Sequence, residues 1–273
     1  MNNINKLQND KIALEAQASA RYYYNQADKY DLSALFFSVA LVFLNIWLIN
    51  NKTVITLQMV WFFINIFIER IINDYVDKGA TLKESFDYYI YGWKTNFSVH
   101  DKDLIKEVSL KNSDFLKTQI ENDGAGTIGG VKDWHTAIDS SWAQNVAIKK
   151  AMKTNVEING ILMKGSKAFL SLLFILMIVY VLLASKNLTA FELLVHIFIT
   201  FSVLSSKIIE TTDNIKRIDD LNLIVNTMLD IEGVNNLKEI QSKIDDKRKI
   251  HFPIDFILYK RLRKKIHNML SSL

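Results

Sequence analysis

The chain has 273 residues, of which 49% are hydrophobic and 23% are charged, and it contains no cysteine. The lack of cysteine excludes disulfides and thiolate chemistry, and a formal net charge of +4 at pH 7 is too small to indicate a DNA or RNA polymer as a partner. Because apolar and charged residues are gathered into separate blocks, we expect an all-α integral membrane protein.

The first predicted element is an N-terminal amphipathic helix within residues 1–31. Four tyrosines, Tyr22, Tyr23, Tyr24 and Tyr30, lie in its last part, directly before the first apolar block. Tyrosine is enriched at membrane–water interfaces, so we expect these side chains at that level. No small-residue cleavage site follows the first apolar block, and a cleaved signal peptide is therefore not expected.

Four apolar blocks predict membrane spans. Three lack any charged side chain, Leu32–Ile49, Thr53–Ile68 and Ala168–Ser185, and the fourth, Leu188–Ser206, carries one carboxylate and one histidine. About 18 residues at roughly 1.5 Å per residue reach about 27 Å, close to the hydrocarbon thickness of a bilayer. Short turns at residues 50–52 and 186–187 join the blocks in pairs. We therefore expect four transmembrane helices in two hairpins, over residues 32–73 and 166–208.

Basic residues predict the orientation in the membrane. Lysine and arginine are concentrated in residues 74–165 and 209–273, whereas each hairpin turn holds a single lysine. Such residues favour the cytoplasmic side. We therefore expect a cytoplasmic helical domain over residues 74–165, C-terminal cytoplasmic helices over residues 209–273, and a multi-pass protein of the bacterial inner membrane with both termini in the cytoplasm.

Apolar spacing predicts the helices outside the spans. Residues three and four apart indicate helices over Leu82–Trp93 and Asp103–Glu121, and a long helix from about Ala137 into the third span. A seam of coiled-coil-like spacing follows the fourth span at Ile218, Leu221, Val225 and Met228. The final segment, Ile254–Leu270, is basic and amphipathic, which fits either the inner leaflet or a solvated terminal helix.

Polar side chains interrupt the predicted spans at helical spacing. Such groups are costly in hydrocarbon and usually face a bundle interior, a partner chain or water. They predict either a pore formed by several copies of the chain or hydrogen bonds within a single four-helix bundle. The pore-lining candidates are Asn45, Gln58, Asn65, Glu69, Glu192, His196 and Thr200.

Signals of catalysis are weak. Gly124–Gly129 matches G-x-G-x-x-G, but a charged helical stretch precedes it where a dinucleotide site needs an apolar strand. A looser role as a phosphate-cradling loop beside Lys132 stays open. Glu192 and His196 lie one helical turn apart, yet zinc requires three or four ligands. We expect no enzyme activity, no catalytic residue, no metal and no cofactor.

Short stretches over nearly the whole chain resemble one family. They are Ala16–Lys29, Glu84–Asp87 with Trp93, Lys132–His135, Ile240–Arg248, and Phe252–Phe256 with Tyr259 and the basic run Arg261–Lys265. These stretches are similar to those of the SMODS-associated four-transmembrane (S-4TM) effectors, a family of pore-forming proteins found beside bacterial cyclic-oligonucleotide synthases. His135 replaces the family's usual tyrosine, and Ile254 interrupts its Pro-Asp step.

The resemblance implies a role in anti-phage defence. An infection-triggered synthase makes a cyclic oligonucleotide, the effector responds, and membrane integrity is lost in an abortive infection. The expected function is that of a homo-oligomeric, pore-forming effector gated by a cyclic oligonucleotide bound to its cytoplasmic domain. The alternative is a non-conducting membrane scaffold or regulator that binds a cytoplasmic partner.

A receptor for a cyclic oligonucleotide needs cations for phosphates and aromatic rings on which bases can stack. The middle domain offers both. The ligand-binding candidates are Phe86, Trp93, Lys94, Lys132, Trp134 and His135. For Phe86 and Trp134, packing in a hydrophobic core is the alternative.

Overall fold

The computed structural model describes residues 1–48, 52–124, 126, 129–184, 208–224, 227, 234–249, 258–259, 261–262 and 266. Its helices in chain order are α1 (Ile4–Leu7), α2 (Lys11–Trp47), α3 (Lys52–Ile90), α4 (Val99–Lys111), α5 (Ser113–Glu121), α6 (Gln144–Ala184) and α8 (Val234–Arg248), with a further helix over residues 208–224. In this part of the chain, β pairing is confined to an isolated bridge between Asp123 and Lys132. The all-α class is confirmed.

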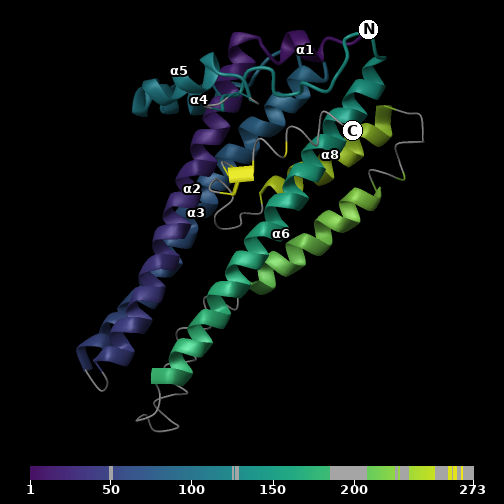
Figure 1. Cartoon of the computed structure of the whole chain (residues 1–273). Coiled ribbons are helices and arrows are strands. Elements are labelled where there is room, and N and C mark those ends of the chain that lie inside the picture. The colour runs from purple at the N-terminus through teal and green to yellow at the C-terminus, as the bar shows by residue number, and fades with distance from the viewer. Residues whose placement is uncertain are drawn as a thin grey trace.

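Long helices run away from one end of the molecule, where the short helices gather (Figure 1). α2 and α3 form an antiparallel hairpin, and α6 extends from the same end, with the helix over residues 208–224 beside it (Figure 1). α1, α4, α5 and α8 lie toward this same end. We call residues 33–47, 53–71 and 168–183 the arms, and the remaining described residues the head.

The long helices pass from head to arm without a break. α2 has 37 residues, which at 1.5 Å per residue correspond to about 55 Å, well beyond the roughly 30 Å of a hydrocarbon core. It contains neither glycine nor proline. The predicted domain boundaries after residues 31, 73 and 165 fall within α2, α3 and α6, so head and arms are parts of the same three helices.

Three predicted helix limits differ from the structure. The N-terminal helix is interrupted after α1, because residues 8–10 form a turn before α2 begins. The helix predicted over Asp103–Glu121 is two helices, separated at Asn112. The long helix that enters the third predicted span begins at Gln144 and not near Ala137, because residues 137–143 form turns against the N-terminal segment.

Local capping explains the limits of α4 and α5. The Ser98 side chain accepts a hydrogen bond from the Asp101 backbone at 3.1 Å, and the Asp101 carboxylate accepts one from the Ser98 backbone at 2.9 Å. This reciprocal pair is a capping box, which fixes the start of α4. The Asn112 side chain then accepts from the Phe115 backbone at 3.2 Å, so a new helix starts where α4 stops.

Two hydrophobic cores hold the head together. One joins the first half of α2 to α3, α4 and α5 around the fully buried Tyr23, whose hydroxyl donates to the Leu104 carbonyl at 3.1 Å. The other joins α3, α6 and α8 to the helix over residues 208–224, where Ile218 and Leu221 of the predicted seam are buried. Val225 and Met228 of that seam lie outside the described residues.

The arms expose large apolar side chains. Phe36 is 74% exposed, Trp47 83%, Phe63 63% and Leu183 68%, and similar side chains surround them on all three helices. Soluble monomers rarely leave so continuous an apolar surface in water, so this pattern is typical of contact with lipid or with other chains. Other apolar side chains of the arms pack together, as Leu35 does with Leu170, so one face of each helix is covered and another is exposed.

By length and composition, one described helical stretch qualifies as a membrane span, Gln144–Tyr180 within α6. The predicted first and second spans lie on α2 and α3. Like α6, both helices expose large apolar side chains. The predicted fourth span, Leu188–Ser206, lies outside the described residues. The topology of four spans therefore stays a prediction.

Candidate functional site

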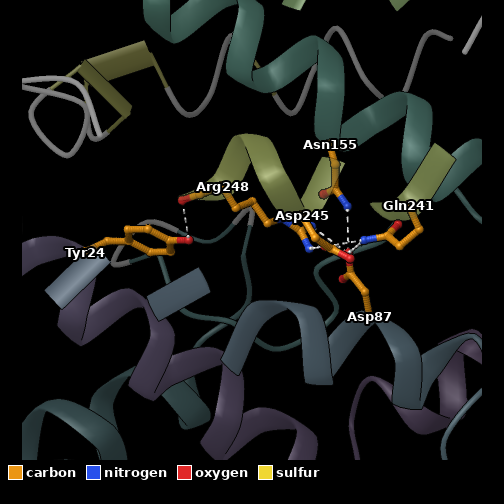
Figure 2. A network of polar contacts seen from close by, with 6 residues as sticks. All are labelled: Tyr24, Asp87, Asn155, Gln241, Asp245 and Arg248. Carbon is orange, nitrogen blue, oxygen red and sulfur yellow. Dashed lines mark hydrogen bonds and ion pairs between the residues drawn. The ribbon is translucent and has the colours of Figure 1, made fainter. Parts of the chain in front are cut away.

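A buried network of charged and amide side chains lies in the head, where α3, α6 and α8 meet (Figure 2). At its centre is Asp87 of α3, which is fully buried. One of its oxygens, Oδ2, accepts a hydrogen bond from Nη2 of Arg248 at 2.5 Å, from Nε2 of Gln241 at 3.2 Å and from Nδ2 of Asn155 at 3.5 Å. The Asp87 carboxylate thus links α3 to two other helices, to α6 through Asn155 and to α8 through Gln241 and Arg248.

A second carboxylate completes this network. Asp245, one turn before Arg248 on α8, accepts from Nη1 of Arg248 at 2.9 Å and from Nε2 of Gln241 at 2.7 Å. The Arg248 backbone carbonyl also accepts from the hydroxyl of Tyr24 at 3.3 Å, which brings in α2 (Figure 2). We call Asp87, Asn155, Gln241, Asp245 and Arg248 the Asp87 junction. It connects all three helices that continue into the arms.

Burial and charge act in opposite directions at this junction. Burial alone would raise the pKa of Asp87, but the positive charges of Arg248 and Lys83 outweigh it and hold that pKa below its usual value. Burial raises the pKa of Asp245 to about 7, because its contact with Arg248 compensates only in part. Asp87 therefore remains ionised opposite Arg248, while Asp245 changes its charge near neutral pH.

A cation surrounded by aromatic rings lies next to the junction. Lys83 precedes Asp87 by one turn of α3, and its Nζ is 4.6 Å from the ring centre of Phe86 and 5.2 Å from that of Trp134. This Nζ is buried and has no hydrogen-bond partner among the described residues. Burial lowers the pKa of Lys83 to about 7. An ammonium so poorly satisfied is a ready partner for an incoming anion.

Arg21 of α2 approaches the same tryptophan. Its guanidinium carbon lies 5.6 Å from the ring centre of Trp134 and 5.4 Å from that of Tyr259. Arg21 also donates to the side chain of Gln119 at 2.6 Å and to the carbonyl of Gly130 at 3.0 Å. Trp134 therefore contacts two cations, Lys83 and Arg21, a combination suited to a ligand that carries both phosphates and bases.

The predicted ligand-binding residues fall into separate places. Phe86, Trp134 and His135 surround or adjoin Lys83, with Phe86 fully buried in the core. Trp93 and Lys94 follow the end of α3 and contact Tyr88. The ring centres of Trp93 and Tyr88 are 5.5 Å apart, and Nζ of Lys94 is 4.9 Å from the ring centre of Tyr88. The remaining candidate, Lys132, is exposed next to the Asp123 bridge.

A polar pocket lies beside His135. Its volume is about 660 Å³, and its lining residues are Asn5, Gln8, Asp123, Gly126, Asp133, His135 and Thr136. Side-chain amides of the N-terminal segment hold one wall. Asn9 exchanges two hydrogen bonds with Asp133, of 2.6 Å and 3.1 Å, and Gln8 accepts from the His135 backbone at 2.9 Å. We call this cavity the His135 pocket.

The predicted pore-lining residues are only partly described. Gln58 is buried, Asn65 is half-buried and Glu69 is exposed, all on α3. For Asn45 the backbone is described but the side chain is not, and Glu192, His196 and Thr200 lie outside the described residues. Whether these side chains share one face therefore stays a prediction.

The junction itself was missed by reasoning from sequence. Asp87 and the pair Gln241 and Arg248 lie 154 and 161 residues apart, and spacing gives no signal for such a pair. Both ends lie in stretches that resemble the S-4TM effectors, Glu84–Asp87 and Ile240–Arg248. That shared likeness is the one signal that could have suggested their contact.

No group of three or more histidine, aspartate or glutamate side chains in the described part of the chain could hold a metal ion. Arg248 pairs with Asp87 across two helices and with Asp245 within α8. Nζ of Lys83, Oδ1 of Asp87 and Oδ2 of Asp245 are buried without a hydrogen-bond partner among the described residues.

The family model described as the SMODS-associating 4TM effector domain matches residues 2–272. Neither the curated proteins nor the solved structures contain a match to this chain.

Proposed function

Because the chain belongs to the SMODS-associating 4TM effector family, and is therefore a membrane effector associated with a system that makes cyclic oligonucleotides, we propose that it forms a pore when such a nucleotide binds its head. The observation that carries the proposal is the connection between head and arms. α3 and α6, which the Asp87 junction links to each other and to α8, also carry the exposed apolar surface.

The arms support the membrane-disrupting half of the proposal. Their large exposed apolar side chains suit lipid, and the polar candidates among them need a partner that lipid cannot provide. Two or three helices cannot enclose a water-filled path, so several copies of the chain would have to associate. We propose that Asn45, Gln58, Asn65, Glu69, Glu192, His196 and Thr200 face that path in the oligomer.

The head supports the gating half. Lys83 and Arg21 beside Trp134 offer positive charge and an aromatic surface, which phosphates and bases require. We retain Phe86, Trp93, Lys94, Lys132, Trp134 and His135 as ligand-binding candidates and add Lys83 and Arg21. An anion that draws Lys83 away from Asp87 would weaken the charge balance at the junction and allow α3, α6 and α8 to repack.

The same proposal specifies the membrane and the topology of the protein. Residues 32–73 and 166–208 would form two transmembrane hairpins in the bacterial inner membrane. The head would lie in the cytoplasm together with both termini, where a soluble nucleotide is made.

The test is release of a dye from vesicles. The full chain is reconstituted into dye-loaded vesicles of bacterial phospholipid, insertion is verified by flotation, and cyclic di- and trinucleotides are added one at a time. At least one nucleotide should release the dye, and cross-linking of the released sample should trap oligomers. Full retention of the dye across the whole panel by inserted protein would contradict pore formation and favour the non-conducting scaffold.

A matched pair of variants tests the binding site in the same assay. Lys83→Met should raise the nucleotide concentration needed for half-maximal release at least tenfold, because it removes the buried ammonium. Lys102→Met removes an exposed lysine of α4 and should leave the response unchanged. Equal responses of the two variants would remove Lys83 from the site.

A further inference from the structure

α8 packs against the head through a face that mixes apolar and polar side chains. Leu237, Ile240 and Ile244 are buried in the core that α8 shares with α3 and α6. Gln241 and Asp245 lie one turn apart on the same helix and are buried as well. An ionised carboxylate is costly to bury, whereas its neutral form is much less so. The strength with which α8 packs therefore depends on whether Asp245 carries a proton.

Two buried carboxylates share one set of donors at this place (Figure 2). Nε2 of Gln241 donates to Asp87 at 3.2 Å and to Asp245 at 2.7 Å, and Arg248 donates to each carboxylate through a different nitrogen. Because both distances from Gln241 meet at one nitrogen, the two accepting oxygens can be no farther apart than the sum of those distances. When both carboxylates are ionised, two like charges thus face one guanidinium at short range. Such a pair favours a proton on one member.

Asp87 keeps its charge, so the proton belongs to Asp245. Against the effect of burial, the charges of Arg248 and Lys83 hold the pKa of Asp87 below its usual value. Burial raises the pKa of Asp245 from 3.8 to about 7, and Arg248 opposes this rise only in part. The negative charges of Asp87 and Glu84 act in the same direction as burial. The pair therefore holds one firm negative charge and one that depends on pH.

The charged and titratable groups of the described chain that face Asp245 come from α3 and α8. They are Glu84, Asp87, Tyr88, Tyr91 and Arg248. Both tyrosines have a raised pKa and stay neutral near pH 7. α6 adds only the uncharged amide of Asn155 to the Asp87 junction, and α2 adds the hydroxyl of Tyr24. Lys83 interacts with Asp87 and has a pKa of about 7 too, so a test has to account for it.

The sign of the pH effect separates Asp245 from Lys83. Because the pKa of Asp245 is raised on folding, its stabilising contribution is fully present below about pH 4 and is lost as the pH rises through about 7. The lowered pKa of Lys83 acts the other way, since its burial costs less as the pH rises. A hold on α8 that weakens as the pH rises is therefore the mark of Asp245.

We infer that α8 is a proton-dependent clamp, which holds α3 firmly when Asp245 carries a proton and loosens when Asp245 is ionised beside Asp87. The clamp itself requires no ligand. Its consequence for gating rests on the proposed function, in which α3, α6 and α8 repack when the pore opens. In that case a more acidic cytoplasm raises the nucleotide concentration that opening requires.

Hydrogen exchange followed by mass spectrometry tests the clamp in the detergent-solubilised full chain without nucleotide. Exchange is recorded at pH 6, 7 and 8 and is corrected for the chemical rate at each pH. The protection of α8 should fall by up to about tenfold from pH 6 to 8, the change expected for a group whose pKa is about 7 when docked and about 4 when released. α4, which packs in the other core, is the internal reference and should show no such fall.

Two neighbouring aspartates of α8 provide a matched pair of variants. Asp245→Asn keeps the size and an accepting oxygen for Gln241 and Arg248 but carries no charge. Its α8 should therefore keep, at all three pH values, the protection that the unchanged chain has at pH 6. Asp246→Asn removes an exposed carboxylate and should retain the fall. Lys83→Met removes the titration of opposite sign, so it should show the fall at least as clearly as the unchanged chain.

The outcomes distinguish the clamp from the proposed function. Protection of α8 that does not fall with rising pH in Lys83→Met overturns the clamp even if cyclic nucleotides release dye, and so does an equal fall in Asp245→Asn. The expected fall together with full retention of dye upholds the clamp and contradicts the pore. Where dye is released, the nucleotide concentration for half-maximal release should drop from pH 6 to 8 in the unchanged chain and stay constant in Asp245→Asn.

Discussion

In the head, the carboxylate of Asp87 and the guanidinium of Arg248 are buried against each other, whereas along the arms Phe36, Phe63 and Leu183 lie on the surface. The usual rule of apolar inside and charged outside is broken twice in one chain, in opposite directions. The difference teaches that each region is built for a different surrounding. The arms suit a solvent of lipid, where exposed phenylalanine costs nothing, and the head uses buried charge to fix helices against each other in water.

The largest effect is expected from unpairing the buried charge in the head. Arg248→Ala leaves Asp87 buried without its main partner, and breaking a buried pair in this way costs about 3–5 kcal/mol. The change should be measured as a loss of thermal stability of the purified chain in detergent. Arg217→Ala, on an exposed site of the helix over residues 208–224, is the control and should change the unfolding temperature little.

A double variant sharpens the meaning of that result. Asp87→Leu combined with Arg248→Met replaces both charges by apolar side chains, which in other buried pairs is often neutral or stabilising. The double variant should therefore recover much of the stability that Arg248→Ala loses, yet fail to release dye if the charges carry the gating signal. Dye release equal to that of the unchanged chain would reduce the junction to a structural role.

A second prediction tests whether the exposed apolar side chains of the arms contact lipid. Phe63 on α3 and Leu110 on α4 are both largely exposed, 63% and 79%, but one belongs to an arm and the other to the head. If the arms lie in lipid, Phe63→Asp should disfavour insertion by about 2.5–3.5 kcal/mol, the cost of an aspartate near the centre of a membrane helix. Leu110→Asp should be neutral, because its side chain meets water.

Membrane flotation of cell lysates measures this difference. Phe63→Asp should move a substantial share of the protein into aggregates or lead to its degradation, while Leu110→Asp should float with the membranes. If both variants float equally, the exposed apolar surface of the hairpin does not contact lipid, and the contrast between head and arms fails.

The sequence predicted the arms better than the head, for a physical reason. Lipid imposes a local constraint, a run of about 20 apolar residues, and this can be seen in one window of the chain. The all-α class followed from these runs, whereas the family followed from short stretches outside the apolar blocks. The Asp87–Arg248 pair could not be predicted from spacing, because its energy depends on three helices meeting in space.

The structure also explains why single residues were harder to assign. For Phe86 and Trp134 the sequence left both core packing and a ligand site open, with core packing favoured. Both pack beside one buried ammonium, Lys83, which no motif singled out. The N-terminal asparagines were overlooked because this segment was predicted as one amphipathic helix, whereas residues 8–10 form a turn between α1 and α2. Asn9 instead holds Asp133 from 124 residues away.

A third prediction concerns how the head responds to pH. The pKa of Lys83 is lowered to about 7 by burial, from an ordinary value of 10.5. A lowered pKa means that the unfolded chain binds this proton first, so Lys83 reduces stability progressively as pH falls from about 10 toward 7 and by a constant amount below that. The slope cannot exceed about 1.4 kcal/mol per pH unit.

Comparison of unfolding temperatures tests this sign. Lys83→Met should gain stability relative to the unchanged chain as the pH falls from about 9.5 to 7, below the range in which tyrosines ionise. Lys102→Met, at an exposed site, should track the unchanged chain at every pH. A constant difference across this range would mean that the Lys83 ammonium is satisfied by a partner in solution.

The smallest effect is expected where the head depends on a few side-chain hydrogen bonds at a partly buried site. Asn9→Ala removes both hydrogen bonds to Asp133 at a partly buried site, which should cost roughly 1–2 kcal/mol, since one of the bonds meets a carboxylate. The lost bonds also free the left-handed backbone at Asp133, so the unfolding temperature of the purified chain should fall. Asn96→Ala, an exposed amide near the end of α3, is the matched control and should leave that temperature unchanged. Equal unfolding temperatures of Asn9→Ala and the unchanged chain would show that water replaces both contacts and that the N-terminal segment does not hold the turn at Asp133.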